Sequence, residues 1–560
     1  MVFERDVPIS VGDLQLRANV FRPDRKGCFP VLVSHGPYGK DVHFADAFAP
    51  QWAEIKSIYP GIDTDGSTGR FLRWELPDPE RWVPHGYVVV HVDSRGSGKS
   101  PGLLQGWSPQ ETADYGCVIE WAGIQDWSNG KVGLLGVSYL AVNQWQVAAT
   151  KPTHLAAICP WEGAFDFYRD IARHGGILQD YFWKLWWPKQ VIENQHGNAD
   201  TRYFDRDTGE RTTGPALSAE VLRANRIDFF DEVGVDPLDG DWYQARTPRG
   251  ADIDIPILSA GNWGGQGLHL RGNVEGYLAA GSRRKWLELH GGTHFETFNM
   301  PEWVALQRHF FDRFLKDAAN GWDKTPPVIL RVRYPDRFET RLESSWPLAG
   351  TRWTKTFLDG DAATLREDAP EDEQVVSYDP SNAAVEFRTV PFENETEITG
   401  PVSAKLWVSS DGCDLDLFLT LRAYNARGEE IVFPGATDPA VPISQGWLRA
   451  SQRELCPERS LPGRPFHSHQ NRLLLEQSQV VCVEVEIWPT SIVLSQGCVL
   501  GLRIEGKDFE RPGSPYLRKG SGPFLHQDSN DRDPALFGRL NRIHTGGQTP
   551  SHLLLPIIAR

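Results

Sequence analysis

The chain has 560 residues, more than one hydrophobic core usually serves, so two or three domains are expected. Apolar residues make up 40% and charged residues 24%, which is typical of a soluble globular protein. A formal net charge of -16 argues against nucleic-acid and anionic-membrane partners, because both require a basic surface. No apolar run approaches the roughly 18 residues of a membrane span, and the charged N-terminus lacks the apolar region of a signal peptide.

Seven cysteines are scattered along the chain, and none forms a CxxC pair. This distribution favours buried free thiols in a reducing cytoplasm over a disulfide framework or a zinc site. The sequence therefore predicts a cytoplasmic protein without a structural metal ion.

The first part of the chain alternates short apolar runs with helical stretches. At the N-terminus apolar and polar residues alternate, which is typical of edge strands. Six later runs are expected to form further strands: 29–34, 87–93, 131–136, 155–159, 255–260 and 285–290. Apolar runs that are bounded by glycine and separated by helices predict a buried parallel sheet. A further helix is expected from Pro301, because large apolar side chains recur on one face after it.

Two segments do not follow this alternation of strands and helices. From about residue 166 to 250 the strand pattern gives way to helical, aromatic-rich sequence, which predicts a helical insertion over the sheet. After about residue 323 short strands recur between turn residues, which predicts an all-β sandwich of jelly-roll type. The expected domains are an α/β domain over 1–165 and 251–322, a helical cap over 166–250 and a jelly roll over 323–560.

The stretch KVGLLGVSYLAV, at 131–142, has the form of a nucleophilic serine between a strand and a helix. Strand and helix crowd each other at such a turn, and Gly136, two residues before Ser138, relieves the crowding. The common pattern G-x-S-x-G has a second glycine where this chain has Leu140, but Ala141 offers a small side chain one position later. The motif alone fits equally well a serine that merely ends a buried strand.

A serine nucleophile needs a base, which is expected after a later strand. The run RRKWLELHGGTHFETF ends a strand and supplies two histidines. His294 lies in the loop and is better placed to reach Ser138, whereas His290 lies within the strand and is expected in the core or behind the site. For an oxyanion hole the candidates are the backbone N–H of Tyr139 and the side chain of Tyr38, for which a packed loop tyrosine is the alternative.

Three further stretches belong with the serine motif: PYGKD, VDSRGSGKSPG, and D-Y-x(4)-E-W from Asp114 to Trp121. Together they closely resemble the X-Pro dipeptidyl-peptidase-like serine hydrolases, which include cocaine esterases and alpha-amino-acid ester hydrolases. The resemblance covers essentially the whole chain and implies an α/β-hydrolase domain with an inserted helical cap and a C-terminal jelly roll. It also implies that Ser138 is the nucleophile, His294 the base, and Tyr38 with Tyr139 the oxyanion hole, with no metal or organic cofactor.

The family's catalytic aspartate is missing at its usual place. The resemblance implies an aspartate in a G-W-x-D-like loop, but that loop reads AGNWGGQGLHLRG, with Gly264 or Gly265 at the position of the carboxylate. A carboxylate must still orient the histidine and stabilise its protonated form. We expect Glu162, which follows the strand LAAIC, to replace it, with the two glycines leaving room for its longer side chain. Glu288, within a strand, and Asp166, at the cap hinge, are the alternatives.

Aromatic residues of the cap and the glycine-rich loop are candidates for a substrate pocket. These are Trp183, Trp186, Trp187, Trp263 and His269. A cap core at helical spacing is the alternative that explains most of the cap tryptophans, and a role in holding the loop is the alternative for the histidine.

Together, these observations predict a serine hydrolase that cleaves an ester or amide through an acyl-enzyme intermediate. Its substrate is expected to be a small-molecule ester, an amide or a short peptide. Release of an X-Pro dipeptide is the alternative within the enzyme class, and an inactive ligand-binding homologue is the alternative outside it. The sequence is compatible with a homo-oligomer.

Overall fold

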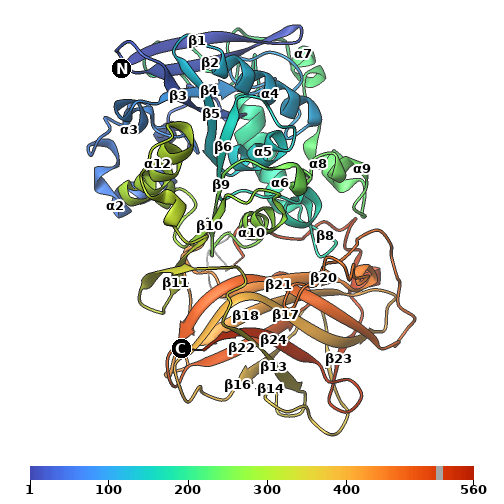
Figure 1. The fold of residues 1–560 in the computed structure, drawn as a ribbon. Coiled ribbons are helices and arrows are strands. Elements are labelled where there is room, and N and C mark those ends of the chain that lie inside the picture. The colour runs from blue at the N-terminus through green and yellow to red at the C-terminus, as the bar shows by residue number, and fades with distance from the viewer. Residues whose placement is uncertain (512–520, 560) are drawn as a thin grey trace.

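The computed structural model describes residues 1–511 and 521–559 and contains two large sheets (Figure 1). The first has ten strands in the order β1-β2-β4-β3-β5-β6-β9-β10-β11-β12. Six largely buried strands run parallel at its centre: β3 (Phe29–Gly36), β4 (Val88–Asp93), β5 (Ser128–Val137), β6 (Leu155–Trp161), β9 (Ile257–Asn262) and β10 (Lys285–His290). The predicted buried parallel sheet is confirmed.

A hairpin completes each edge of this sheet. At one edge lie β1 (Val2–Val11) and β2 (Leu14–Arg22), as the alternating N-terminal sequence predicts. At the other edge β11 (Val328–Arg333) pairs with β10, and β12 (Phe338–Glu343) pairs with β11. The sequence pattern assigns these last two strands to the C-terminal sandwich; they instead extend the first sheet, because β10 offers an open edge where the chain returns.

Helices cover both faces of the first sheet (Figure 1). One face carries α4 (Pro109–Gly123), α5 (Tyr139–Ala148) and α10 (Leu270–Ala279), and the other carries α12 (Pro301–Leu315). Successive residues of a strand point to opposite faces. In β3, accordingly, Val31 and Val33 pack with the α4 side, whereas Leu32 packs with Phe311 of α12.

The segment between β6 and β9 forms a cap of short helices joined by irregular stretches. It contains a π-helical turn (Phe167–Ala172), a short hairpin, β7 (Arg173–His174) with β8 (Ile177–Leu178), and the helices α6 (Tyr181–Trp186), α7 (Ala219–Ala224), α8 (Phe229–Gly234) and α9 (Asp241–Gln244). Its aromatic core packs against Tyr38 and Tyr139, at the start of α5. The cap therefore lies over the point where β5 ends.

The C-terminal part forms the second sheet, of twelve strands, around an apolar core (Figure 1). Its strands are β13 (Thr351–Asp359), β14 (Thr364–Arg366), β15 (Gln374–Tyr378), β16 (Ala384–Thr389), β17 (Thr396–Ser410), β18 (Asp416–Tyr424), β19 (Glu430–Ile431), β20 (Ser444–Arg449), β21 (Val481–Leu494), β22 (Val499–Glu505), β23 (Asn541–Thr545) and β24 (His552–Ile558). Apart from β14 with β16, the pairings are antiparallel. Because β24, which pairs with β13 at one end of the strand order, also pairs with β17 near the other end, the sheet curls back on itself.

All seven cysteines are unpaired. Only Cys159 and Cys498 are buried, so the expectation of buried thiols is correct for two of them and wrong for the exposed Cys28, Cys117 and Cys482. Within 1–511 and 521–559, none of the helices combines the length and the apolar character that a bilayer crossing requires.

Candidate active site

Ser138 lies at the sharp turn where β5 ends and α5 begins. Its φ of 58° is in the left-handed region, which is unusual for a residue other than glycine. A Cβ atom at Gly136 would lie 2.6 Å from Cβ of Leu140, and one at Gly163 would lie 2.8 Å from Cβ of Ala141. The turn therefore needs glycine before the serine and a small residue three positions after it, and it accepts Leu140.

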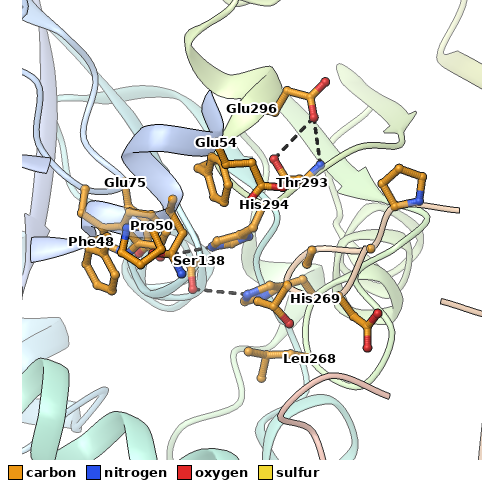
Figure 2. Close-up of a pocket in the computed structure, with 18 of the residues that line it drawn as sticks. Phe48, Pro50, Glu54, Glu75, Ser138, Leu268, His269, Thr293, His294 and Glu296 are labelled. Carbon is orange, nitrogen blue, oxygen red and sulfur yellow. Dashed lines mark hydrogen bonds and ion pairs between the residues drawn. The ribbon is translucent and has the colours of Figure 1, made fainter. Parts of the chain in front are cut away.

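The side chain of Ser138 opens into a cavity of about 430 Å³ (Figure 2). Three parts of the chain line it: the segment 38–75, the cap helix α6, and the loops that follow β9 and β10. The C-terminal domain closes it with residues 434–439 and Phe524. No motif in the sequence indicates this contribution, because it depends on how the two sheets are packed together.

Glu162 follows β6 and places its carboxylate between two histidines. Its Oε2 lies 2.8 Å from Nδ1 of His294, and its Oε1 lies 3.0 Å from Nε2 of His290. Burial raises the pKa of Glu162, but the two histidines outweigh burial and lower that pKa to about 2. Glu162 is therefore an ionised hydrogen-bond acceptor at neutral pH.

The same contacts act on the histidines in the opposite direction. Burial disfavours their charged forms, but the neighbouring carboxylates overcome it and raise the pKa of His294 to about 10 and that of His290 to about 9. In the absence of a substrate, both imidazoles are therefore protonated at neutral pH.

The two alternative carboxylates contact other partners. Glu288, within β10, lies 2.6 Å from Nδ1 of His290 rather than next to His294. Asp166 pairs with Arg169 of the cap, with 2.9 Å between Oδ2 and Nη1. His290 is buried behind the cavity, as expected for a residue within the strand.

Packing against the C-terminal domain explains why an aspartate is absent after β9. A Cβ atom at Gly264 would lie 2.5 Å from Cα of Gly435, so the backbone of that domain occupies the space that a side chain needs. The N–H of Ala436 donates to the carbonyl of Gly264, and the N–H of His294 donates to the carbonyl of Ala436, both at 3.1 Å. At Gly264 the expectation that glycine leaves room for Glu162 is wrong, because the C-terminal domain fills that space, and at Gly265 the nearest atoms belong to Asn262, His269 and Leu270. Glu162 reaches His294 from the end of its own strand.

Nε2 of His294 faces Glu75, a residue that the sequence gives no reason to single out. Oε1 of Glu75 lies 3.1 Å from this nitrogen. The backbone of Glu75 is also left-handed, with φ 63°, and its carbonyl accepts a hydrogen bond of 3.2 Å from the N–H of Val137, next to Ser138. Burial raises the pKa of Glu75, and His294 opposes this rise. Only the tertiary fold brings this carboxylate to the serine.

His269 contacts the serine itself (Figure 2). Its Nε2 lies 3.3 Å from Oγ of Ser138, and its ring stacks on that of His294 with centroids 5.0 Å apart and an interplanar angle of 7°. Burial, and then the charge of His294, lower the pKa of His269 to about 3. In the resting site Ser138 is therefore hydrogen-bonded to the neutral His269, while the charged His294 faces Glu75.

Of the two candidate oxyanion donors, Tyr38 lines the cavity, and Tyr139 directly follows Ser138, which also lines it. The hydroxyl of Tyr38 accepts a hydrogen bond of 3.0 Å from Nε1 of Trp186, which leaves its own O–H available as a donor. Tyr139 is the first residue of α5, and the first N–H groups of a helix have no partner within the helix. The hydroxyl of Tyr139 is engaged elsewhere, 2.5 Å from Oε2 of Glu111.

Of the five candidate pocket residues, Trp186 and His269 line the cavity, and Trp183, Trp187 and Trp263 do not. Trp183 and Trp187 are one helical turn apart, and both pack against Phe229 in the cap core, with ring centroids 5.6 Å and 5.1 Å away. Trp263 turns away from the site and donates from Nε1 to the carbonyl of Arg331, at 2.8 Å. Among the described residues, no group of three or more histidine, cysteine, aspartate or glutamate side chains is arranged to hold a metal ion.

The sheet order, the serine at the strand-to-helix turn and the histidine after β10 are those of a serine hydrolase of the α/β-hydrolase type. A family model described as X-Pro dipeptidyl-peptidase (S15 family) matches residues 12–296, and a model of the X-Pro dipeptidyl-peptidase C-terminal non-catalytic domain matches residues 320–554. The chain therefore belongs to the S15 family, as its motifs predict, and is a serine hydrolase that acts on ester or amide bonds.

Individual relatives cover nearly the whole chain. A cocaine esterase from Rhodococcus sp. is 26% identical over 99% of this chain and 98% of its own length. The crystal structure of a CocE/NonD family hydrolase from Staphylococcus aureus is 35% identical, with a TM-score of 0.86 over 100% of this chain and 94% of that one. An alpha-amino acid ester hydrolase, at 15% identity and a TM-score of 0.68, covers 99% of this chain and 96% of its own, and shares the fold.

Proposed function

We propose that Ser138 is the nucleophile of this hydrolase, that His294 is its base, and that Glu162 orients the base. The observation that carries this proposal is the 2.8 Å contact between Glu162 and Nδ1 of His294, beside the cavity into which Ser138 opens. A carboxylate at Nδ1 keeps a proton there, so Nε2 is the atom that exchanges protons with the reacting groups.

The reaction follows the two steps of an acyl-enzyme mechanism. Once Nε2 of His294 has given up its proton, it turns from Glu75 to Ser138. Oγ of Ser138 then leaves His269 and attacks the substrate carbonyl, and its proton passes to Nε2 of His294. The hydroxyl of Tyr38 and the N–H of Tyr139 donate to the resulting oxyanion. The leaving group departs, and water then releases the acyl group by the same chemistry.

The lining of the cavity supports a neutral or cationic substrate with an apolar or aromatic group. Aromatic side chains dominate the walls, and the carboxylates there are Glu54, Glu75, Glu296 and Asp438. None of the described residues that line the cavity is a lysine or an arginine, and the charged His294 is already paired with Glu162 and Glu75. An anionic substrate would therefore meet repulsion without an unpaired cation to offset it. We therefore infer that uncharged and amine-bearing esters and amides are preferred over substrates with a free carboxylate.

The second candidate is release of an X-Pro dipeptide, which the same carboxylates favour because such a substrate carries an α-ammonium group. A panel of p-nitrophenyl acyl esters and of Gly-Pro and Ala-Pro p-nitroanilides separates the two. We expect higher kcat/KM for the esters, because the cavity is largely apolar; higher values for the anilides would assign the dipeptidase reaction instead.

A fluorophosphonate probe tests the nucleophile directly. The wild-type chain is expected to react with one equivalent of the probe, and Ser138→Ala is expected not to react. If neither protein is labelled, or if both are labelled equally, the proposed nucleophile is wrong and the chain is better explained as an inactive ligand-binding homologue.

We propose further that the C-terminal sheet is a jelly roll and that the domains are 1–165 with 251–322, the cap 166–250, and the remainder of the chain, of which β11 and β12 extend the first sheet and the jelly roll begins at β13. The all-β content after β12 and the pairing of β17 with β24 support the jelly roll. The unpaired cysteines support a cytoplasmic location.

A further inference from the structure

We propose that Glu75 is a further catalytic residue of this site, which gives a proton to the leaving group and later takes one back from His294. The proposal deepens the proposed function and rests on it, because it needs Ser138 as nucleophile and His294 as base. It assigns the delivery of the leaving-group proton to a carboxylate in the segment between β3 and β4.

The geometry places Glu75 beside the base and in the wall of the cavity into which Ser138 opens. Its Oε1 lies 3.1 Å from Nε2 of His294, the nitrogen that exchanges protons during the reaction. Its Oε2 is buried and makes no hydrogen bond of normal geometry with a described residue, although Glu75 lines the same cavity as Ser138. The carbonyl of Glu75 is held by the N–H of Val137, so this carboxylate is fixed to the strand that carries the nucleophile.

The surroundings of Glu75 favour its protonated form. The titratable groups that face it are His294, Glu162 and Tyr38, and the Trp74 indole lies beside it. Burial raises the pKa of Glu75 and the charge of Glu162 adds to this rise, while contacts with His294 and Trp74 oppose it. A buried carboxyl with a raised pKa can carry a proton at neutral pH, as a general acid must.

Glu75 and His294 therefore share one proton. With the proton on His294 they form an ion pair, and with the proton on Glu75 they form a neutral pair in which Nε2 is free to act as a base. The transfer spans a single hydrogen bond of 3.1 Å and leaves the net charge of the buried site unchanged.

In acylation the neutral pair acts first. Oγ of Ser138 bonds to the carbonyl carbon while its proton passes to Nε2 of His294. When the bond to the leaving oxygen or nitrogen breaks, its electron pair stays on that atom, which takes the proton of Glu75. The products are the acyl-enzyme, a neutral leaving group, and the carboxylate of Glu75 beside the imidazolium of His294, which are in contact at 3.1 Å.

Deacylation restores the starting state. The imidazolium of His294 first returns its proton to Glu75, so that Nε2 can accept a proton from the attacking water. When the bond between the acyl carbon and Oγ breaks, Ser138 takes that proton from His294. One water is consumed, the acid is released, and Glu75 is again protonated.

The test uses two esters of one acid that differ in their need for a proton. p-Nitrophenyl butyrate releases a stable anion, whereas ethyl butyrate releases an alkoxide that must be protonated. In Glu75→Gln we expect kcat/KM for the ethyl ester to fall about 10²-fold or more and that for the p-nitrophenyl ester to fall less than tenfold. The values are compared on the plateau of each pH profile, because the substitution also changes the pKa of His294.

The matched control is Glu54→Gln, the same chemical change at an exposed carboxylate of the cavity rim. It is expected to change the two kcat/KM values by the same factor. Fluorophosphonate labelling shows that the site of Glu75→Gln is assembled, because release of fluoride needs no general acid. If Glu75→Gln is labelled at the wild-type rate but loses both esterase activities equally, the proton-transfer role is wrong; if the wild-type chain itself is not labelled, the proposed function fails first.

Discussion

Two histidine-bearing loops meet at Ser138, and their histidines differ in everything that determines proton transfer. His294, after β10, has a carboxylate at each ring nitrogen, whereas the buried Nδ1 of His269, after β9, has no hydrogen-bond partner among the described residues. The rings are stacked 5.0 Å apart, yet the pKa of His294 is raised to about 10 and that of His269 is lowered to about 3. The carboxylates next to each ring therefore decide which of the two histidines can act as the base. A short distance to Ser138 does not by itself identify it.

Removing each histidine in turn is the strongest way to break this comparison. We expect His294→Asn to lower kcat by about 10⁴- to 10⁶-fold, because no other group in the site combines a reachable proton acceptor with a carboxylate that stabilises its charge. The measurement is kcat for p-nitrophenyl butyrate, with folding checked by thermal unfolding. A loss smaller than that of His269→Asn would reverse the assignment of the base.

Glu162→Gln removes the carboxylate that distinguishes His294 from His269 and leaves both rings in place. The amide cannot stabilise the imidazolium and does not fix Nδ1–H as a carboxylate does, so we expect kcat to fall by about 10⁴-fold with KM little changed. Glu288→Gln is the matched control, because that carboxylate is hydrogen-bonded to His290 and not to His294. Near wild-type kcat in Glu162→Gln would show that another group orients the base.

Much of the fold could be predicted because its signals are local. Apolar runs bounded by glycine mark β3, β4, β5, β6, β9 and β10, and Pro301 marks the start of α12. The two-residue strands β7 and β8 of the cap carry no such signal. The prediction failed where the pairing partner determines to which sheet a strand belongs. The run at 328–333 has the composition of a sandwich strand, but it joins the first sheet because β10 is the edge available to it. Strand propensity says that a strand forms and does not say to which sheet it belongs.

The residues of the site also fall into those that local sequence signals predict and those that only the tertiary fold brings together. Ser138, Glu162 and His294 could be singled out because each follows a recognisable strand, and parallel strands bring their carboxyl ends together. Glu75 could not, because it lies in an irregular segment without a motif and reaches Ser138 only through the tertiary fold. The filling of the space at Gly264 by Gly435 was equally hidden, since it depends on the packing of two domains.

A smaller effect is expected at the second histidine. His269→Asn removes the ring that holds Oγ of Ser138 in the resting site, and we expect kcat/KM to fall by about 10- to 10²-fold, as for a nucleophile that is less well oriented. The rate of fluorophosphonate labelling should fall by a similar factor, because the effect lies on the serine and precedes acylation. A loss as large as that of His294→Asn would make His269 the base and contradict the comparison.

The smallest expected effect is on stability at alkaline pH. The pKa values of His294 and His290 are raised to about 10 and about 9 in the folded chain, from an ordinary 6.5, so their protonation stabilises the fold fully below about pH 6.5. This stabilisation is lost as the pH rises through 9 and 10. Because Glu162 contacts both rings, Glu162→Gln should flatten the loss.

Urea unfolding at pH 7 and pH 10 measures this difference. We expect the free energy of unfolding of the wild-type chain to fall by at least about 1.4 kcal/mol more than that of Glu162→Gln, the equivalent of one pKa unit. Glu54→Gln, at the exposed rim, should follow the wild-type chain, since tyrosines and lysines that titrate in this range contribute equally to both. An equal loss in all three proteins would mean that the histidines are not held in their charged forms, and the contrast between His294 and His269 would then have to rest on geometry alone.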